Sequence, residues 1–552
     1  MTETKSMFWA DQIAERMVNR ERFNHIDKVI KKPSKFVIKS STSISGVPHI
    51  GNACDVIRHD AVVRALRDRG EKVRFIWVAE DMDPLRKVPA GIPPEYSKYL
   101  GMPVADLPCP EGCCKSYSEH FCNKFIKSLK ENFGTDPEFL STSKEYRKGF
   151  FAKYVGSVFD NLDLVKEIIN KAKKNPVSAD WNPWKPVCEN CGKIITTKVI
   201  SREGNIIKYS CEDYQFKEFG KEAYTKLKGC GHKGECDILK GNGKLLWRVE
   251  WGMLWAAWKV NFEAAGKEHF MPSGSFWSAG EIAEKVFGWA EPYPVKNPIQ
   301  PYEYLTLNGK KMSASKGNVV ATWEWPEFAP PQILRLLFLK KPNKVRDFSY
   351  QNIPIYSNEF DQMQKAFFTK SGEDKNLAQM KRLYEMSEIE IPKTIPPQMP
   401  FGIATMISQI IPEDKVVEKA EYLLRSLELV KGKLSKEDKI YIETRLKMAK
   451  NWIRNYGEDQ HIVNVLNEAN IIGLSEKQID ALKDIKTGLT SKMKEKELKD
   501  YLYSISEKHG LTAKEFYSAF YTAVIGKTMG PRTIPLIITL GANKIKKILE
   551  SV

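Results

Sequence analysis

The feature that most constrains the fold is a short apolar strand, a turn of small residues and a helix in direct succession. Residues 36–39 predict the strand, residues 40–52 are rich in serine and glycine, and residues 53–69 carry apolar side chains at helical spacing. A strand that enters a helix through such a turn directs backbone N–H groups towards a phosphate. The sequence therefore predicts the first unit of a parallel, nucleotide-binding sheet, with His49 and Asn52 together at the helix start.

A basic loop lies far downstream, at residues 309–318. It combines small residues with lysines, directly after an apolar, strand-like segment at residues 302–307. Small residues let the backbone approach a ligand closely, and lysines on a loop supply mobile positive charge. Alone, this pattern is also typical of a solvated basic turn. Together with the turn at residues 40–52, it favours a loop that closes over a polyphosphate.

The composition favours a nucleic-acid partner. The chain has 552 residues, of which 42% are hydrophobic, and this length is enough for about two to four domains with sizeable cores. A net charge of +17 favours a polyanion, nucleic acid rather than membrane, over a merely soluble basic surface.

No segment of the sequence indicates secretion or membrane insertion. Residues 1–22 carry both charge signs throughout and predict an amphipathic helix. The longest apolar runs fall well short of the roughly 18–20 residues that span a bilayer. We therefore expect a cytoplasmic protein without a membrane partner.

A second predicted strand, at residues 73–79, ends in a cluster of acids. Glu80, Asp81 and Asp83 follow it directly. Ligands of open α/β sheets bind at the carboxyl ends of the strands, so these carboxylates could hold the ammonium groups of an amino acid. The alternative is that they cap helices or lie in a loop. Strands become scarce from about residue 90 to residue 245, which indicates an insertion between two halves of the sheet.

Ten cysteines in such a chain indicate a metal site or isolated thiols rather than a disulfide framework. Cys188 and Cys191 form a Cys-x-x-Cys turn followed by glycine, flanked by segments that predict a hairpin. A second pair, Cys211 and Cys230, would complete a tetrahedral structural zinc site, with His232 as the alternative to Cys230. The polar stretch between the second pair is expected to be a loop excursion.

A second group of cysteines precedes the first in the chain. Cys109, Cys113, Cys114 and Cys122 could form a further metal site. The adjacency of Cys113 and Cys114 disfavours it, because neighbouring side chains do not easily share one ion.

The chain returns to the sheet after residue 245 and becomes helical after residue 330. Tryptophans between residues 247 and 258 recur at helical spacing, which is typical of a helix packed in a core. A proline-rich break at residues 391–400 separates two helical groups. From residue 415 onwards the pattern predicts about five to seven amphipathic helices.

Several motifs, in this order, resemble those of one enzyme family. Residues 49–52 (HIGN) resemble the HIGH element of class I aminoacyl-tRNA synthetases, and residues 311–315 (KMSAS) resemble their KMSKS loop. Residues 247–251 (WRVEW) and 262–269 (FEAAGKEH) are similar to the WRVDW and FEPAGKDH elements of class I lysyl-tRNA synthetases. The resemblance covers nearly the whole chain.

The resemblance implies an α/β fold: a Rossmann-type parallel sheet catalytic domain with a zinc-bearing insertion, followed by an all-helical C-terminal anticodon-binding region. The boundaries that we expect are the two catalytic halves 1–90 and 245–330, the insertion 91–244, a helical linker or stem-contact region 331–400, and the anticodon-binding domain 401–552.

The function that the resemblance implies is ATP-dependent attachment of L-lysine to tRNA(Lys) through a lysyl-adenylate. ATP would bind with Mg²⁺, held mainly by phosphate oxygens. Acids such as Glu80, Asp81 and Glu250 suit a cationic amino acid, whereas a glutamate pocket would need arginines. Another class I specificity (glutamate or arginine), a diverged paralogue and a non-catalytic RNA-binding relative are the alternatives.

The candidate site residues fall into three overlapping groups, of which the resemblance supplies most. The catalytic candidates are His49, Asn52, Lys311, Ser313 and Ser315. The ATP-binding candidates are His49, Gly51, Asn52, Gly266, His269, Lys311 and Met312. The lysine-binding candidates are Ser41, Ser43, Glu80, Asp81, Trp247, Glu250, His269 and Tyr302.

The chain departs from the family pattern at three places. Residues 274–280 read GSFWSAG where the family usually has GSSYDTG, and residues 40–46 read SSTSISG where it usually has SGITPSG. Ala314 stands where many class I enzymes have a second lysine. These changes concern fine substrate contacts and leave the phosphate-binding elements in place.

Overall fold

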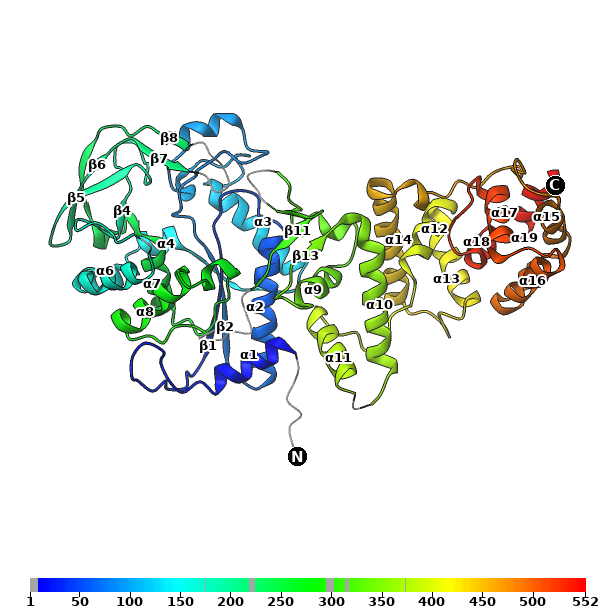
Figure 1. Ribbon diagram of the computed structural model, residues 1–552, viewed down its shortest axis with the longest axis horizontal. Coiled ribbons are helices and arrows are strands. Elements are labelled where there is room, and N and C mark those ends of the chain that lie inside the picture. The colour runs from blue at the N-terminus through cyan, green and yellow to red at the C-terminus, as the bar shows by residue number, and fades with distance from the viewer. Residues whose placement is uncertain (1–7, 174, 218–223, 294–301, 313–316, 373) are drawn as a thin grey trace. The chain divides into compact units, whose positions relative to one another are not determined.

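The computed structural model describes residues 8–173, 175–217, 224–293, 302–312, 317–372 and 374–552. The chain forms two compact units (Figure 1). The first comprises residues 1–323, 334–348 and 385–389, and the second comprises residues 324–333, 349–384 and 390–552.

A parallel sheet organises the first unit. Strands β1 (Phe36–Thr42), β2 (Val73–Ala79) and β3 (Glu138–Ser141) lie in the order β1-β2-β3, all parallel. Phe262 forms parallel bridges with Ile38 on one side and with Tyr293 on the other, which extends the sheet beyond β1. The strand order thus reverses between β1 and the segment at Phe262. Ligands of doubly wound sheets bind at such a switch point, and the predicted α/β fold with a parallel sheet is confirmed.

The predicted helix between the first two strands is α2 (Ile50–Asp68), and it packs against both β1 and β2. Its first turn closes a capping box, because the His49 ring accepts a hydrogen bond from Gly51 N while Asn52 Oδ1 accepts one from His49 N. Residues on nearly all faces of the helix are buried, from Ala53 to Leu66. A helix buried in this way fixes the direction of its N-terminus relative to the sheet.

Strand β3 lies within the predicted insertion 91–244 and yet pairs with β2 in the parallel sheet. Helices α3 (Tyr117–Glu131), α4 (Thr142–Arg147), α5 (Ala152–Asp160) and α6 (Leu162–Lys171) surround it in sequence. The remaining strands of this region are β4 (Trp184–Pro186), β5 (Thr197–Glu203), β6 (Ile206–Cys211), β7 (Tyr214–Lys217), β8 (Tyr224–Leu227), β9 (Lys233–Asp237) and β10 (Gly243–Leu245).

Antiparallel pairing organises these later strands. The order β5-β6-β9 forms one sheet, and β5 and β6 are the hairpin that the sequence predicts. The polar stretch predicted as a loop excursion instead contains a second hairpin, β7-β8. Tyr214 pairs with Leu227 and Phe216 with Thr225 there, so alternating aromatic residues within a polar sequence suffice for a two-stranded ribbon.

After β10 the chain returns to the parallel sheet through helix α7, and helix α1 precedes β1 in the chain. Helix α1 (Trp9–Val18) packs against α2, and α7 (Trp247–Trp258) packs against α8 (Ser275–Phe287). A 3₁₀ turn, Lys267–Phe270, precedes α8. Strand β11 (Leu305–Leu307) pairs with β12 (Lys310–Lys311) and with β13 (Arg346–Phe348), and α9 spans Pro331–Leu339.

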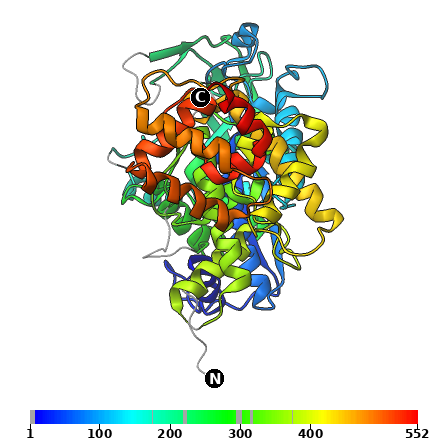
Figure 2. The same cartoon turned by 90° about the vertical axis from the view of Figure 1, so that its right-hand side faces the viewer.

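The second unit is built from helices in its described residues after position 349. They are α10 (Ile353–Thr369), α11 (Lys375–Ser387), α12 (Phe401–Ile410), α13 (Val416–Ser426), α14 (Lys436–Tyr456), α15 (Glu476–Gly488), α16 (Glu495–Lys508), α17 (Ala513–Ile525), α18 (Thr533–Leu540) and α19 (Ala542–Ile548). Figure 2 shows these helices in colours from yellow-green (α10 and α11) to red (α19). Every helix in the described ranges is too short or too polar to cross a bilayer.

Candidate active site

His49 caps the helix that follows β1. Its Nδ1 accepts a hydrogen bond from Gly51 N at 3.0 Å, so the imidazole proton is on Nε2. Burial lowers the pKa of His49 to about 4, because the charged imidazolium would lose its hydration. At neutral pH the ring is therefore neutral and presents Nε2–H as a donor beside the positive end of the α2 dipole.

The basic loop and the start of α2 come together. Ile50 N donates to Val320 O at 2.9 Å, and His49 forms a β-bridge with Ala321 just after the loop. A Cβ atom on Gly51 would lie 2.7 Å from the His49 ring and 3.6 Å from the Met312 methyl group. The two segments predicted to meet at one phosphate are thus close to each other, and a side chain at Gly51 would collide with the His49 ring.

Lys311 lies at the entrance of this loop, exposed on β12. Its Nζ is 3.6 Å from the centre of the Tyr304 ring, and Tyr304 Oη donates to Glu268 Oε2 at 2.8 Å. Asn318 Nδ2 donates to the carbonyl of Lys311 at 3.0 Å, which joins the two ends of the loop. Ser313 and Ser315, the other predicted catalytic residues, lie outside the described residues.

His269 and Gly266 lie on the far side of the switch point. His269 Nδ1 is 2.7 Å from Ser275 Oγ, and its ring meets the edge of Trp251 with centroids 5.2 Å apart. Burial lowers the pKa of His269, so this ring is also neutral. Gly266 pairs with Tyr302 in a parallel bridge.

Tyr302 is buried among other side chains. The guanidinium of Arg58 lies 4.6 Å from its ring centre, and Trp9 and His59 meet it edge-on. Its hydroxyl has no hydrogen-bond partner among the described residues. Tyr302 therefore supports the strand that precedes the basic loop, behind the residues at the switch point.

A buried ion pair occupies the switch point itself. Lys39 Nζ and Glu263 Oε1 are 2.6 Å apart, and both side chains are almost fully buried. Ser41 Oγ donates to the same carboxylate at 3.3 Å, and Trp251 Nε1 and Trp255 Nε1 donate to its other oxygen. With so many donors the carboxylate is fully satisfied, which a buried charge requires.

A second buried cation joins two acids near the end of β2. Lys244 Nζ lies 2.6 Å from Asp83 Oδ1 and 2.7 Å from Glu250 Oε2, and Tyr146 Oη donates to Glu250 Oε1 at 2.9 Å. Ser43 Oγ donates to Asp83 Oδ2 at 3.0 Å. Burial opposes the charge of Lys244, but the two carboxylates raise its pKa above the usual value.

Glu80 is the acid at this end without a complete set of partners. Burial raises the pKa of Glu80 to about 7, although Lys39 acts in the opposite direction. Its Oε1 is buried and has no hydrogen-bond partner among the described residues. An ionisable group perturbed in this way at a strand end is a candidate for ligand binding.

Asp81 differs from its neighbours. Its carboxylate accepts hydrogen bonds from Ser118 Oγ, Ser141 Oγ, Thr142 Oγ1 and Ser143 N, at 2.7–3.2 Å. These donors come from α3 and from the junction of β3 and α4. Asp81 thus links the end of β2 to α3 and α4, and its carboxylate oxygens already accept hydrogen bonds from within the protein.

Trp247 begins α7 and is half-buried. Its ring stacks on Trp251 with centroids 4.8 Å apart. Glu250, three residues after Trp247, is fully buried in the same helix. The first turn of α7 therefore supplies both an aromatic wall and a carboxylate to the acidic end of the site.

The four cysteines predicted to bind zinc converge. Cys188, Cys191, Cys211 and Cys230 place their sulfurs within 4.8 Å of one another. Gly192 adopts a φ of 71° directly after Cys191, and Gly231 a φ of 75° directly after Cys230, left-handed conformations that glycine adopts without strain. His232 Nε2 lies 2.7 Å from Glu189 Oε1 instead. Four convergent thiols suit Zn²⁺ in a closed, structural site.

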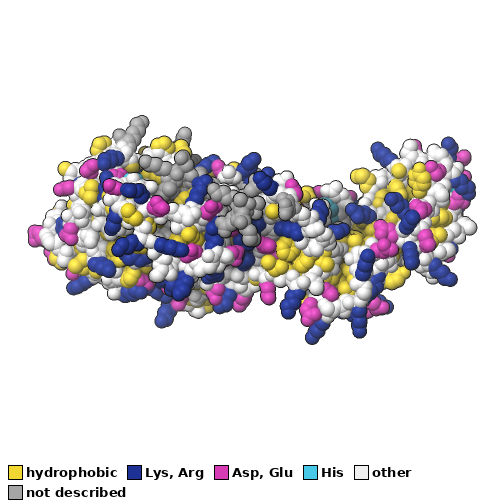
Figure 3. Space-filling model, turned by 90° about the horizontal axis from the view of Figure 1, so that it is seen from below, with side chains coloured by type: hydrophobic (Ala, Val, Ile, Leu, Met, Phe, Trp, Pro, Cys, Tyr) yellow, Lys and Arg dark blue, Asp and Glu magenta, His cyan; other side chains and the backbone are white. Residues whose placement is uncertain are grey.

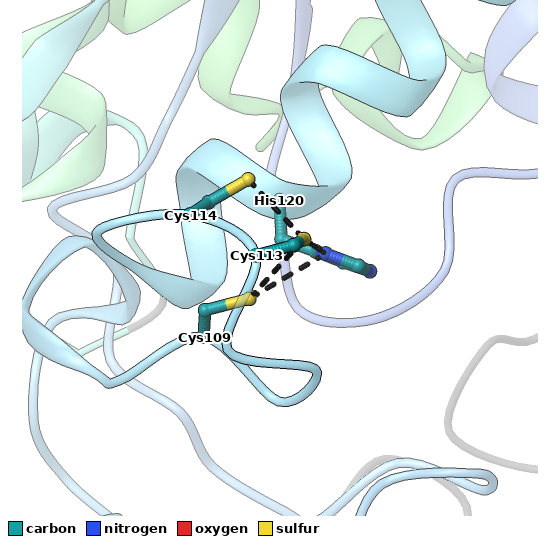
Figure 4. A group of neighbouring side chains, drawn as sticks. All are labelled: Cys109, Cys113, Cys114 and His120. Atoms are coloured by element: carbon teal, nitrogen blue, oxygen red, sulfur yellow. Dashed lines mark hydrogen bonds between the residues drawn. The ribbon is translucent and has the colours of Figure 1, made fainter.

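A second convergent group contains His120 in place of Cys122 (Figure 4). Cys109, Cys113, Cys114 and His120 Nδ1 lie within 4.8 Å of one another, with Cys113 Sγ 3.1 Å from His120 Nδ1. The adjacency of Cys113 and Cys114 does not separate their sulfurs, which are 3.5 Å apart. The reason is that both residues lie in a bend rather than in a strand.

Cys122 is buried on α3 and lies 3.7 Å from Ser118 Oγ. Residues two apart on a helix do not face the same way, so His120 and Cys122 cannot both reach the group. His120 Nε2 is 3.4 Å from Glu111 Oε1, an arrangement that orients metal-binding histidines.

A family model described as tRNA synthetases class I (K) matches residues 7–390. The chain belongs to this family. The lysine–tRNA ligases of Methanosphaera stadtmanae and Methanocaldococcus jannaschii are each 32% identical to it, over 98% and 97% of this chain and 99% and 98% of their own lengths. That of Thermococcus kodakarensis is 33% identical over 98% of this chain and 99% of its own length.

The similarity to solved structures is weaker. A glutamate tRNA ligase from Elizabethkingia meningosepticum covers 94% of this chain and 98% of its own, at 11% identity and a TM-score of 0.39.

Several residues of the candidate active site were not predicted from the sequence. Lys39, Glu263 and Lys244 form the buried ion pairs, and Tyr304 holds Lys311. One of them carried a usable signal: a lysine within the apolar strand β1 needs a buried partner. The partners themselves come from distant segments and are set by the fold.

Proposed function

We propose that the chain attaches L-lysine to tRNA(Lys) in an ATP-dependent reaction through a lysyl-adenylate. One observation carries the proposal. The site combines a phosphate-binding end, where the basic loop contacts the capped start of α2, with an acidic end that suits a cationic amino acid. The family membership supports it, as does the similarity over almost the full length to lysine–tRNA ligases.

In the first step the lysine carboxylate attacks the α-phosphate of ATP and pyrophosphate leaves. Such chemistry needs alignment and charge compensation more than covalent participation of the protein. His49 donates from Nε2 and Asn52 stands beside it at the helix start, while Gly51 leaves room for the phosphates. Lys311 moves from Tyr304 to the negative charge that develops on pyrophosphate. Mg²⁺ would accompany ATP on the phosphate oxygens.

The amino acid would lie with its cationic groups towards the acidic end. Asp83 and Glu250 share Lys244, and Glu263 is paired with Lys39, so these charges are compensated. Glu80 keeps an oxygen without a partner among the described residues and is our first choice for an ammonium group. Trp247 would pack along the methylene stem.

The other residues proposed to bind lysine differ in how directly they would contact it. Ser41 and Ser43 border the two ion pairs, and His269 lies beside Trp251. Asp81 and Tyr302 support the site from behind, Asp81 by its four donors and Tyr302 by its packing.

In the second step the adenylate passes lysine to the terminal ribose of tRNA. We propose that residues 401–552 contact the anticodon and that residues 331–400 contact the stem, in keeping with the largely helical structure of both segments. Zn²⁺ at Cys188, Cys191, Cys211 and Cys230 would crosslink the insertion 91–244 and has no catalytic part here.

The test is ATP–pyrophosphate exchange, measured for each proteinogenic amino acid with and without tRNA. Exchange with lysine alone supports the proposal. Exchange with arginine or glutamate instead would reassign the specificity within class I. Absence of exchange under both conditions, while tRNA still binds, would favour a non-catalytic RNA-binding relative. His49→Ala serves as the inactive control, because it removes the Nε2 donor.

A further inference from the structure

A cavity of about 540 Å³ opens within the second unit. Three segments of the helical bundle line it: helix α13, the loop 489–494 between α15 and α16, and the junction of α18 and α19. Pockets of about 300–1,000 Å³ are typical of ligand sites. Nothing in the proposed chemistry uses this one.

Apolar side chains form part of the inner surface of the cavity. Leu489, Leu498 and Ile537 line it and are nearly fully buried, and Ala542 continues the surface at the start of α19. Helix α18 packs against both α13 and α16, so the surface belongs to the bundle core. A flat apolar group could therefore enter and be desolvated.

The rim is aromatic and basic. Tyr422 on α13 lines the cavity and is 50% exposed, and Lys419 Nζ lies 5.0 Å from the centre of its ring. Lys492 and Lys494 add positive charge from the exposed loop on the opposite side. Glu428 is the one acid that lines the cavity within the described residues.

The remaining rim cation is already engaged. Arg425 donates to Glu421 through Nε and Nη2 and to the carbonyl of Gly432. The lysines therefore supply the available charge. Thr490 and Ser491, exposed on the same loop, add hydroxyl groups that can donate to or accept from a polar edge.

An apolar interior, an exposed tyrosine and a ring of lysines together match one chemical class. Unstacked bases of single-stranded RNA stack on aromatic side chains, and lysines neutralise the adjoining phosphates. The net charge of +17 fits a polyanion. An acidic peptide would satisfy the lysines but would not need the aromatic face.

We propose that this cavity receives an unstacked base of a tRNA loop, with Tyr422 against the base and Lys419, Lys492 and Lys494 around its phosphates. The inference rests on the proposed function, since it takes tRNA as the bound RNA, and it names the residues that contact the loop. Figure 1 shows α13, α16 and α18, which surround the cavity.

The experiment measures binding of the full chain to two RNA probes at several salt concentrations. One probe is a stem-loop with the anticodon arm of tRNA(Lys), and the other is a minihelix with the acceptor arm alone. Tyr422→Ala should weaken stem-loop binding about tenfold and leave the minihelix unchanged. Lys492→Ala should lower the slope of log K against log salt by about 0.7 for the stem-loop.

Matched controls lie outside the cavity. Tyr503→Ala removes a tyrosine that is 63% exposed on α16, and Lys514→Ala removes an exposed lysine on α17. Both should bind the stem-loop like the unchanged protein. Tyr422→Phe should retain most of the affinity, because stacking needs the ring and not the hydroxyl.

The outcomes separate the two proposals. If the unchanged protein binds neither the stem-loop nor whole tRNA, the proposed function fails. If it binds the stem-loop but Tyr422→Ala binds equally well, or if Tyr503→Ala weakens binding as much, the assignment of the cavity is overturned while the function stands. Equal losses for stem-loop and minihelix would also overturn it.

Discussion

The ammonium group of Lys311 lies 3.6 Å from the centre of the Tyr304 ring, and the hydroxyl of Tyr304 is bonded to Glu268. An aromatic face attracts a cation, by about 0.5–1 kcal/mol at an exposed site. This attraction is small compared with the charge that develops on a pyrophosphate leaving group. Lys311 therefore rests on Tyr304 in a position from which it is easily released. This position lies at the start of the loop that contacts the phosphate-binding helix.

Replacing Lys311 should cost far more than replacing its resting partner. Lys311→Ala is expected to slow pyrophosphate exchange by about 100–1,000-fold, because one preorganised donor to the transition state is lost. Tyr304→Leu should change the rate by no more than about fivefold. Lys310→Ala, which removes the neighbouring exposed lysine of β12, is the control and should stay close to the unchanged rate. Equal losses for Lys310 and Lys311 would contradict the role of Lys311.

Glu80 should make lysine binding depend on pH. Its pKa is raised from 4.5 to about 7, so the carboxylate is largely protonated below pH 7 in the free protein. An ammonium ligand prefers the ionised form, so the KM for lysine should fall as the pH rises from about 6 to 8. Glu80→Gln should raise the KM and remove this dependence. A KM that is flat with pH in the unchanged protein would exclude Glu80 as the ammonium partner.

The raised pKa of Glu80 also makes the stability of the protein depend on pH. Between pH 4.5 and about 7 the folded state holds a proton on Glu80 that the unfolded state has lost. The contribution of Glu80 to the unfolding free energy therefore decreases as the pH rises through this window. Compared with Glu80→Gln, the unchanged protein should lose stability from pH 5 to pH 8, as denaturant titrations at the two pH values would measure.

Local sequence patterns predicted the turns and helices of the site, but not which side chains pair with one another there. The turn before α2 and the Cys-x-x-Cys turn are short-range features, and both form as expected. The partner of Lys39 is Glu263, which follows a distant strand segment, and no periodicity links the two. His120 was missed because the bend at Cys113 turns consecutive side chains to one side, a geometry that linear spacing does not show.

Lys244 should be needed for folding as well as for the site. Lys244→Met would leave the buried carboxylate of Glu250 and the partly exposed carboxylate of Asp83 without a counter-ion, and we expect a loss of about 3 kcal/mol in unfolding free energy, mainly from Glu250. Adding Asp83→Asn and Glu250→Gln should recover much of this stability, since both charges are then gone. Lys240→Met, at an exposed neighbouring lysine, should have no effect. If the triple variant is no more stable than Lys244→Met, the ion pairs do not explain the loss.

Gly51 should be sensitive to a single methyl group. A Cβ there would lie 2.7 Å from His49 Cε1 and 2.8 Å from Nδ1, so Gly51→Ala must displace the imidazole. We expect exchange activity to fall at least tenfold with little change in Tm, because the helix itself gains from alanine. Gly156→Ala on α5 is the matched control, since the nearest atom to its Cβ is 4.0 Å away. A Gly51→Ala protein with full activity would show that His49 need not hold its position.

Metal analysis can separate the two cysteine groups. The group at Cys188 contains four thiols, whereas the group at Cys109 contains three thiols and His120, so each has the four ligands of a closed zinc site. Cys211→Ser should remove one zinc per chain, and His232→Ala should remove none, because His232 is bonded to Glu189.

The second group has its own pair of variants. His120→Ala should remove a zinc that Cys122→Ser retains, since the side chain of Cys122 is buried beside Ser118. Zinc measured by mass spectrometry after exhaustive dialysis, together with Tm, checks each case. Loss of a metal that binds only the folded state lowers Tm, and more so where the ion links distant segments; the group at Cys188 joins turns that are far apart in sequence. Its removal should therefore destabilise the protein more than removal of the ion at Cys109, whose ligands span a single turn and the start of α3.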